Sequence, residues 1–259
     1  MPESNEYQEL LQSVQSKDRH CRRCKAQLAH DQPYICINCD LEVGRLLRAR
    51  HTRDKTEAYQ RRLKEAELPK GTRETAWSLE GYAIRDARDT GAVNAIAKWA
   101  GEKHPKIPTL FITGPSGSGK SHLAVAGLKK WIWNHERGGL FVVAPDLMFT
   151  IRSADDQAAV LKMLKFAPAL VIDEMGLENI SDFTAMIWHS ILSFRGPDQE
   201  CLPTIITSNL NLDQLAARWT VKKEKEEEGE PPELRSQRVT RRIADYGLWL
   251  ELTRIYKDE

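Results

Sequence analysis

The stretch 109-TLFITGPSGSGKSH-122 decides the fold class of this chain of 259 residues. Its apolar start predicts a strand, its glycine-rich middle has the spacing G-x-x-x-x-G-K-S, and a helical pattern follows from residue 123. In that strand-to-helix context, glycines allow backbone N–H groups to surround a phosphate at a helix N-terminus. We therefore predict a nucleotide site formed by Gly114, Pro115, Ser116, Gly117, Ser118, Gly119, Lys120, Ser121 and His122.

Two residues of this loop and two later residues predict a catalytic centre. Lys120 is expected to bridge the β- and γ-phosphates, and Ser121 is expected to ligate Mg²⁺. Another buried strand, within 169-ALVIDEMG-176, ends in Asp173 and Glu174. Asp173 is expected to hold Mg²⁺ through water, and Glu174 to act as the general base toward a water molecule. This Asp-Glu pair, in a sequence without N-K-x-D, favours ATP hydrolysis over a GTP switch.

Three more apolar stretches bring the number of expected strands to five. They cover residues 140–145, 203–210 and 248–253, and helical patterns separate the strands. Such alternation predicts an α/β fold with a doubly wound parallel sheet, in which ligands bind at the carboxyl ends of the strands. The stretch 203–210 ends in polar residues, and Asn209 is expected to orient the water beside the γ-phosphate. The alternative is an ordinary turn asparagine.

Four cysteines near the N-terminus form two C-x-x-C pairs. Cys21 and Cys24 are followed, after eleven residues, by Cys36 and Cys39. Two such pairs can complete the tetrahedral ligand shell of zinc, and the metal would supply much of the folding free energy of so small a module. The alternatives are a redox pair or unlinked thiols. We predict one Zn²⁺ in an N-terminal zinc ribbon or knuckle.

Composition limits the class of protein. Hydrophobic residues make up 41% and charged residues 29% of the chain, the net charge is +1, and no apolar run is long enough to span a bilayer. The N-terminus lacks the pattern of a signal peptide. We therefore expect a cytoplasmic protein without a membrane partner.

Charge and turn signals suggest three regions. Residues 1–44 are expected to form the zinc module, residues 45–72 a basic helical linker, and residues 73–259 the ATPase domain. The linker region is either a solvated helix or a basic arm near phosphates. Residues 221–234 are too charged to pack, so we expect a mobile surface loop there.

Over residues 80–256, the chain resembles the AAA+ family, and within it the replicative helicase loaders of DnaC and DnaI type, with IstB transposition helpers close by. The resemblance rests on GYAIRDARDTGAVNAIAKWAG, GPSGSGKSHLAVA, VVAPDLMFTIR, LVIDEMG, TIITSNL and RVTRRIADYG. PDL after the second strand and R-V-x-x-R before the last strand are more particular to the loaders. The resemblance implies a P-loop AAA+ domain without the C-terminal helical lid of most AAA+ proteins.

The resemblance also implies a function. The chain would be a bacterial or phage ATPase that loads a hexameric replicative helicase onto single-stranded DNA. Its DNA contacts would be Arg152 and residues 181–183, although Phe183 also fits the apolar face of a helix. Arg242, with Arg238 close by, would reach the ATP site of the next subunit. Such head-to-tail contact builds a ring or a spiral.

Two other functions stay open. One is an IstB-like helper of transposition that uses ATP to assemble on duplex DNA. The other is a zinc-bearing adaptor that hydrolyses ATP slowly and serves mainly in binding. Loaders of DnaI type carry a cysteine-bearing N-terminal domain that grips the helicase, so the module in residues 1–44 is a hypothetical hook for a partner.

Overall fold

The computed structural model describes residues 37–72, 77–179, 181–219, 239–245 and 247–253. The chain divides into two compact units, residues 1–58 and 59–259. Several predictions lie outside the described residues: the zinc ligands Cys21, Cys24 and Cys36, the charged segment 221–234, and Arg238. Of Cys39, only the backbone is described.

Helix α2 (Ile37–Glu65) begins in the first unit and ends in the second. It crosses the boundary that we expected between residues 44 and 45 as one continuous helix. Residues 41–58 are mostly exposed, whereas Leu63 and Ala66 near the end of the helix are buried. The last turns of the expected linker are therefore part of the core of the second unit.

A parallel sheet forms the centre of the second unit. Its strands are β1 (Thr109–Thr113), β2 (Leu140–Val143), β3 (Leu170–Asp173), β4 (Thr204–Ser208) and β5 (Gly247–Glu251), in the order β2-β3-β4-β1-β5. All four neighbouring pairs are parallel. The predicted five-stranded parallel sheet is thus confirmed. Three strands are shorter than the apolar stretches that predicted them: β2, β4 and β5. Strand β2 ends at Val143, because a helix with proline in its first turn begins at Ala144.

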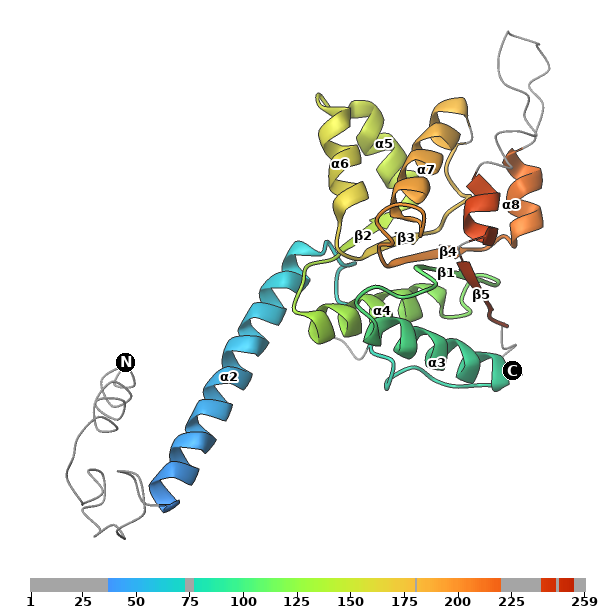
Figure 1. Ribbon diagram of the computed structural model, residues 1–259. Coiled ribbons are helices and arrows are strands. Elements are labelled where there is room, and N and C mark those ends of the chain that lie inside the picture. Colours follow the sequence, from blue (N-terminus) through green and yellow to red (C-terminus); the bar gives the residue numbers. More distant parts are fainter. Residues whose placement is uncertain (1–36, 73–76, 180, 220–238, 246, 254–259) are drawn as a thin grey trace, which may run out of the picture. The chain divides into compact units, whose positions relative to one another are not determined.

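Helices cover both faces of the sheet (Figure 1). On one face lie α3 (Ala87–Gly101) and α4 (Lys120–His135) with the end of α2, and on the other lie α5 (Ala144–Ser153), α6 (Gln157–Phe166), α7 (Asp182–Arg195) and α8 (Leu212–Trp219). Strand β1 shows how the two cores are divided. Leu110 and Ile112 enter the core beneath α3 and α4, whereas Phe111 enters the core beneath α5 to α8. This is a doubly wound sheet, as predicted.

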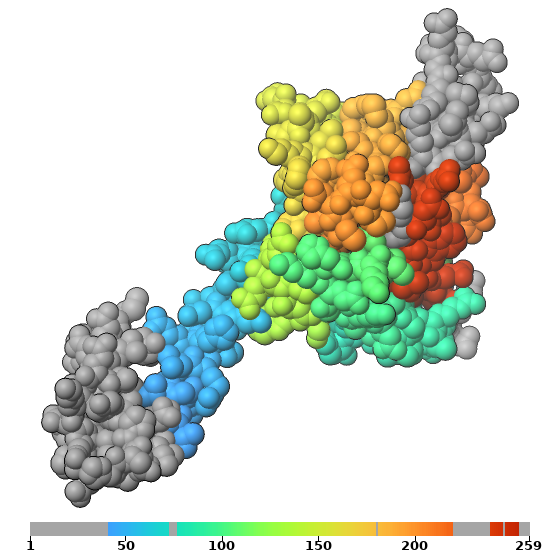
Figure 2. Space-filling view, viewed as in Figure 1, coloured from blue at the N-terminus to red at the C-terminus, as the bar shows by residue number. Residues whose placement is uncertain are grey.

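Segments far apart in the sequence meet on one surface of this unit. In the space-filling view, a green surface, an orange surface and the red surface of the C-terminal region adjoin one another (Figure 2). The carboxyl ends of the parallel strands share one edge of the sheet, and that edge is where an α/β protein binds ligands.

Arg195, at the end of α7, is buried with 1% of its surface exposed. Its guanidinium group donates to the Thr204 hydroxyl and to the carbonyl oxygens of Leu164, Lys165, Ala167 and Pro203. Burial lowers the pKa of Arg195 to about 9, which leaves it charged at neutral pH. The charge therefore caps the C-terminal end of α6 and fastens α7 to the start of β4.

Within the described part of the chain, every helix is too short or too polar to cross a bilayer.

Candidate nucleotide site

The P-loop leaves the buried strand β1 at Gly114 and enters α4 at Lys120. Gly117 and Gly119 have φ values of +79° and +96°, in the left-handed region that favours glycine. At Gly114, a Cβ atom would lie 2.4 Å from the carbonyl oxygen of Leu252. Among the described side chains, none caps the N-terminus of α4. The loop and the first N–H groups of the helix therefore fit an anionic ligand such as a phosphate.

Lys120 folds back over the P-loop. Its Nζ donates to the carbonyl oxygens of Gly114 and Pro115, each at 2.8 Å, and 7% of the residue is exposed. Burial lowers the pKa of Lys120, and the negative charges of Asp173 and Glu174 partly offset this effect. The ammonium group thus already lies at the loop, held by neutral oxygens that phosphate oxygens can replace as stronger partners.

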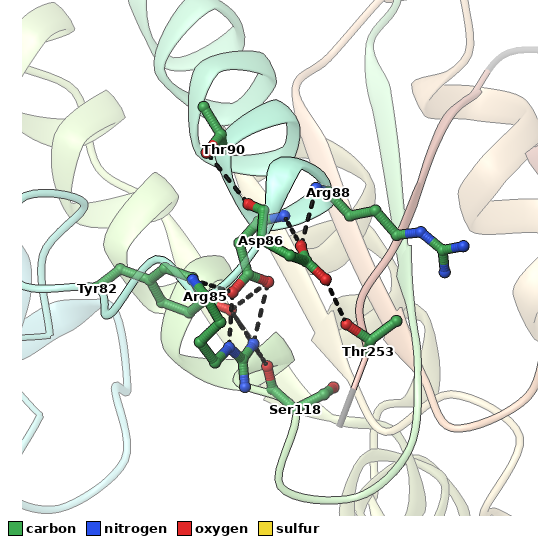
Figure 3. A network of polar contacts seen from close by, with 8 residues as sticks. Tyr82, Arg85, Asp86, Arg88, Thr90, Ser118 and Thr253 are labelled. Carbon is green, nitrogen blue, oxygen red and sulfur yellow. Dashed lines mark hydrogen bonds and ion pairs between the residues drawn. The ribbon is translucent and has the colours of Figure 1, made fainter. Parts of the chain in front are cut away.

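Residues that precede β1 in the chain hold the P-loop through a polar network (Figure 3). Nη2 of Arg85 donates to the carbonyl oxygen of Ser118 at 2.5 Å, and the Tyr82 hydroxyl lies 3.2 Å from the same oxygen. The carboxylate of Asp89, which is fully buried, accepts from Nε of Arg85 at 2.6 Å. Asp89 belongs to the first turn of α3. The network therefore anchors the phosphate loop to a helix that precedes it in the chain.

The same network extends to the end of the sheet. Asp86 caps α3 by accepting from the backbone N–H groups of Arg88 and Asp89, each at 2.9 Å. Its other carboxylate oxygen accepts from the Thr253 hydroxyl at 2.7 Å, as Figure 3 shows. Thr253 follows β5, the edge strand beside β1. Segments before β1 and after β5 thus bracket the P-loop.

His122 is packed in an aromatic group beside the loop. Its ring stacks on Trp77 with centroids 5.1 Å apart and meets the edge of Tyr82 at 5.3 Å. Nε2 lies 3.1 Å from the carbonyl oxygen of Ser78, so this nitrogen carries the hydrogen. Burial lowers the pKa of His122, which keeps the ring neutral at neutral pH. In this arrangement, His122 fastens the segment before α3 to the helix of the P-loop.

The carboxyl end of β3 meets the P-loop at Asp173. One oxygen of its carboxylate, Oδ1, accepts from the Ser121 hydroxyl at 3.0 Å and from the Thr207 hydroxyl at 2.5 Å. Asp173 is 6% exposed. A carboxylate and a hydroxyl side by side are oxygen ligands of the kind that Mg²⁺ prefers. Ser121 and Asp173 therefore fit the predicted magnesium site.

Glu174 follows at the surface. Its side chain is exposed, its φ is +61°, and its backbone N–H donates to Oγ1 of Thr207 at 3.0 Å. The Thr207 hydroxyl thus bridges the carboxylate of Asp173 and the backbone of Glu174. This contact from β4 sets the two acidic residues relative to one another.

Two other predicted residues lie at the surface. Asn209 directly follows β4, is exposed, and makes no side-chain hydrogen bond with the described residues. Arg242 lies in the helical residues 239–245, with Nη1 3.4 Å from Oδ2 of Asp198. Asn209 therefore shares the strand-end edge with Asp173, whereas Arg242 pairs with a surface carboxylate.

The structure brings together the residues that we expected to contact DNA. Nη2 of Arg152, at the end of α5, donates to Oγ of Ser181 at 3.1 Å. The guanidinium carbon of Arg152 lies 5.4 Å from the ring centroid of Phe183 in α7. Phe183 is partly buried in α7 and packs against the core beneath α5 to α8, as expected for the apolar face of a helix, whereas the DNA contact stays a prediction.

Sequence reasoning missed several residues around the site. The pair Arg85 and Asp89 has i,i+4 spacing where α3 begins, which is a signal that could have revealed it. Glu178, a fully buried carboxylate, has no such signal, because its partner Trp188 lies in the following helix. The sequence indicated that Thr207 is a polar residue at the end of a strand, but not that it contacts Asp173 and Glu174.

A phosphate loop beside a strand-end Asp-Glu pair, on a doubly wound parallel sheet, defines a P-loop nucleotide-binding protein. The chain belongs to the family of IstB-like ATP binding proteins, whose model matches residues 17–223. This match confirms the expected resemblance to the IstB group, and the matches to DnaC and DnaI confirm the expected homology to the loaders.

The replicative helicase loader DnaC of Escherichia coli strain K12 is 24% identical over 143 residues, which is 53% of this chain and 57% of the relative. The chain thus spans little more than half the length of the curated relatives it matches. A crystal structure of DnaI is 25% identical, has a TM-score of 0.59, and is matched over 68% of this chain and 90% of that one. A crystal structure of the DnaC helicase loader is 24% identical, with a TM-score of 0.57 over 70% of this chain and 99% of that one.

Proposed function

We propose that the protein hydrolyses ATP and uses hydrolysis to load a replicative DNA helicase onto single-stranded DNA. The observation that carries the ATPase is the contact between Ser121 and Asp173, 3.0 Å apart beside the P-loop, with the exposed Glu174 directly after it. The loader role is supported by relatives that are named as replicative helicase loaders.

The geometry supports a role for each residue of the site. Lys120 exchanges its two carbonyl partners for phosphate oxygens. Ser121 and Asp173 hold Mg²⁺, which neutralises phosphate charge when it is bound. Glu174 accepts the proton of the attacking water, and Asn209 orients that water. Because the backbone of Glu174 is held by Thr207, the base stands in a defined place beside the metal ligands.

A loading experiment tests the whole proposal. The protein, a replicative helicase of the same source and circular single-stranded DNA are mixed with ATP, and helicase bound to DNA is measured after gel filtration. We expect more helicase on the DNA with the wild type than with the Lys120→Ala variant. Turnover of ATP without any binding to the helicase would contradict the loader role and leave the ATPase role standing.

The IstB-like helper is the second candidate, because the matching family model is that of IstB-like ATP binding proteins. Such a helper assembles on duplex DNA. Binding to duplex and single-stranded oligonucleotides of equal length, with and without ATP, separates the two functions. Preference for single strands supports the loader, and ATP-dependent assembly on duplexes supports the helper.

The proposed single-strand surface is formed by Arg152 and Phe183. An arginine can pair with a phosphate and a phenyl ring can stack on a base, which contributes about 1–3 kcal/mol per base. We expect the Arg152→Ala, Phe183→Ala double variant to bind an oligothymidylate at least tenfold more weakly. Unchanged affinity would remove this surface from the proposal.

We further propose that Arg242 acts at the ATP site of a neighbouring subunit, with Arg238 close by, in a head-to-tail ring or spiral. An arginine supplied in this way can raise turnover by about 10³- to 10⁵-fold. The test mixes Arg242→Ala with Glu174→Gln, each inactive alone. Mixed interfaces that join an intact Glu174 to an intact Arg242 should restore hydrolysis, whereas a dead mixture that still assembles contradicts the role.

We also propose that the N-terminal module binds one Zn²⁺ through Cys21, Cys24, Cys36 and Cys39, and that this module binds the helicase. Elemental analysis of purified protein gives the zinc content. We expect Cys36→Ser to lose both zinc and helicase binding while ATP turnover persists. A metal-free protein that still binds the helicase would refute the proposal.

A further inference from the structure

The turn that carries Glu174 is strained and tightly enclosed. The backbone N–H of Leu177 donates to the carbonyl oxygen of Glu174 at 3.2 Å, and the φ values of Glu174 and Gly176 are +61° and +95°. For a residue other than glycine, a left-handed backbone is sterically unfavourable. A Cβ atom at Gly176 would lie 2.7 Å from Cδ1 of Leu215 in α8. Contacts from the surroundings must therefore keep this turn in place.

Strand β4 holds one side of the turn. The backbone N–H of Met175 donates to the carbonyl oxygen of Thr207 at 2.9 Å, and the Ser208 hydroxyl donates to the carbonyl oxygen of Met175 at 2.6 Å. Together with the bond from Glu174 to Thr207, these contacts continue the sheet beyond the end of β3.

A buried carboxylate holds the other side. Glu178 is 1% exposed, its Oε2 accepts from the backbone N–H of Gly176 at 2.7 Å, and its Oε1 accepts from the indole N–H of Trp188 at 2.8 Å. Trp188 lies in α7 and is fully buried. Burial raises the pKa of Glu178, and its hydrogen bonds together with the positive charge of Arg218 in α8 partly offset this effect. Both of its oxygens are thus committed to N–H donors, one in the turn and one in the helix.

We propose that Glu178 is a positioning residue for ATP hydrolysis. Its carboxylate links the turn that carries Glu174 to Trp188 of helix α7. The proposal rests on the proposed role of Glu174 as the base. Two acceptor oxygens are needed at this place, because donors approach from two directions. An amide in place of the carboxylate offers one oxygen, and its NH₂ group then faces an N–H donor. A carboxylate is therefore specific for this link, although it is costly to bury.

The test uses Glu178→Gln, Trp188→Phe and the double variant. In Glu178→Gln, the amide satisfies only one of the two donors, so the turn or the helix contact is lost. In the double variant, the indole N–H is gone and the amide oxygen is free to accept from Gly176. Trp131→Phe is the matched control, since Trp131 is also fully buried and its indole N–H has no hydrogen-bond partner among the described residues.

We expect kcat of Glu178→Gln to fall by about 10- to 100-fold, because small displacements of a catalytic group have effects of this size. KM and the affinity for a fluorescent ATP analogue should stay within threefold of the wild type. The double variant should recover turnover relative to Glu178→Gln, although it carries one more substitution. Trp131→Phe should keep the wild-type kcat. A residue needed only for folding would instead make the double variant the least active of all.

Three results decide the question. A kcat for Glu178→Gln within twofold of the wild type overturns the proposal, and so does a double variant less active than Glu178→Gln. Amide hydrogen exchange of Gly176 gives a readout independent of activity: it should be slow in the wild type and faster in Glu178→Gln. Fast exchange in the wild type overturns the link by itself.

A further result separates this link from the proposed ATPase function. Absence of ATP turnover in the wild type, with slow exchange at Gly176, contradicts the proposed ATPase function and leaves the link standing.

Discussion

The P-loop and the turn that carries Glu174, residues 174–177, are neighbours that are held in different ways. The P-loop is bracketed by segments before β1 and after β5, through a charged network of Arg85, Asp86 and Asp89. The turn is held by hydroxyl groups of β4 and by the buried carboxylate of Glu178. Each region thus has its own anchors, and the contact between Ser121 and Asp173 joins them. We infer that nucleotide binding and turnover can be altered separately.

The largest expected effect is on the turn. Glu174→Gln should reduce ATP turnover by about 10²- to 10⁴-fold, because it removes the proposed general base. Affinity for ATP should change little, since the P-loop anchors are intact. Steady-state hydrolysis and nucleotide titration measure the two effects. Glu200→Gln, at another exposed glutamate, is the control, and a turnover of Glu174→Gln near that of the control would contradict the assignment.

The second effect is on the anchors of the P-loop. Arg85→Ala leaves the buried carboxylate of Asp89 without its ion-pair partner, so the free energy of unfolding should fall by about 3 kcal/mol. Arg85→Lys keeps the charge but not the forked geometry, so its free energy of unfolding should lie between those of the wild type and Arg85→Ala. The control is Arg88→Ala, which breaks an exposed pair with Glu251 at 3.8 Å and should cost less than about 1 kcal/mol. Urea unfolding measures all three; equal losses for Arg85→Ala and Arg88→Ala would show that the network is not an anchor.

The third effect is on nucleotide affinity. Lys120→Ala removes a charged donor, and hydrogen bonds to charged groups contribute about 1.5–3 kcal/mol. We expect the dissociation constant for ATP to rise by about 10- to 100-fold, as measured by titration with a fluorescent analogue. Glu174→Gln serves as the comparison, because it should retain affinity. If both variants bound ATP equally, the separation of the two regions would be wrong.

The smallest effect is a pH dependence at the turn. Burial raises the pKa of Glu178 above its ordinary value of 4.5, so the folded protein holds this proton more tightly than the unfolded chain does. The contribution of this group to stability is therefore fully present below pH 4.5 and is lost as the pH rises through the raised pKa. Relative to Glu178→Gln, the wild type should lose free energy of unfolding over that range in urea unfolding. Parallel pH curves for the two proteins would show that the carboxylate is not desolvated.

Much of the fold followed from local patterns. The apolar strands, the glycine-rich loop and the alternation with helices predicted a doubly wound parallel sheet, and the structure has one. The strand ends did not follow from these patterns: residues 140–145 are apolar throughout, but α5 begins at Ala144, with Pro145 in its first turn. Helix α2 also crosses the expected boundary near residue 44, because charge composition does not show where a helix ends.

By itself, the sequence determined the P-loop and the Asp-Glu pair, because the spacing of glycine, lysine and carboxylates is local chemistry that needs no distant partner. The tertiary structure alone decided what surrounds them. Arg85 lies 33 residues from Ser118 in the chain, and Thr207 lies 34 residues from Asp173. Such contacts depend on the order of strands in the sheet and on which helix covers which face. Glu178 shows the same point, since its burial follows from the packing of α7 and α8 on the sheet, and a charged side chain gives no sign of burial in a sequence.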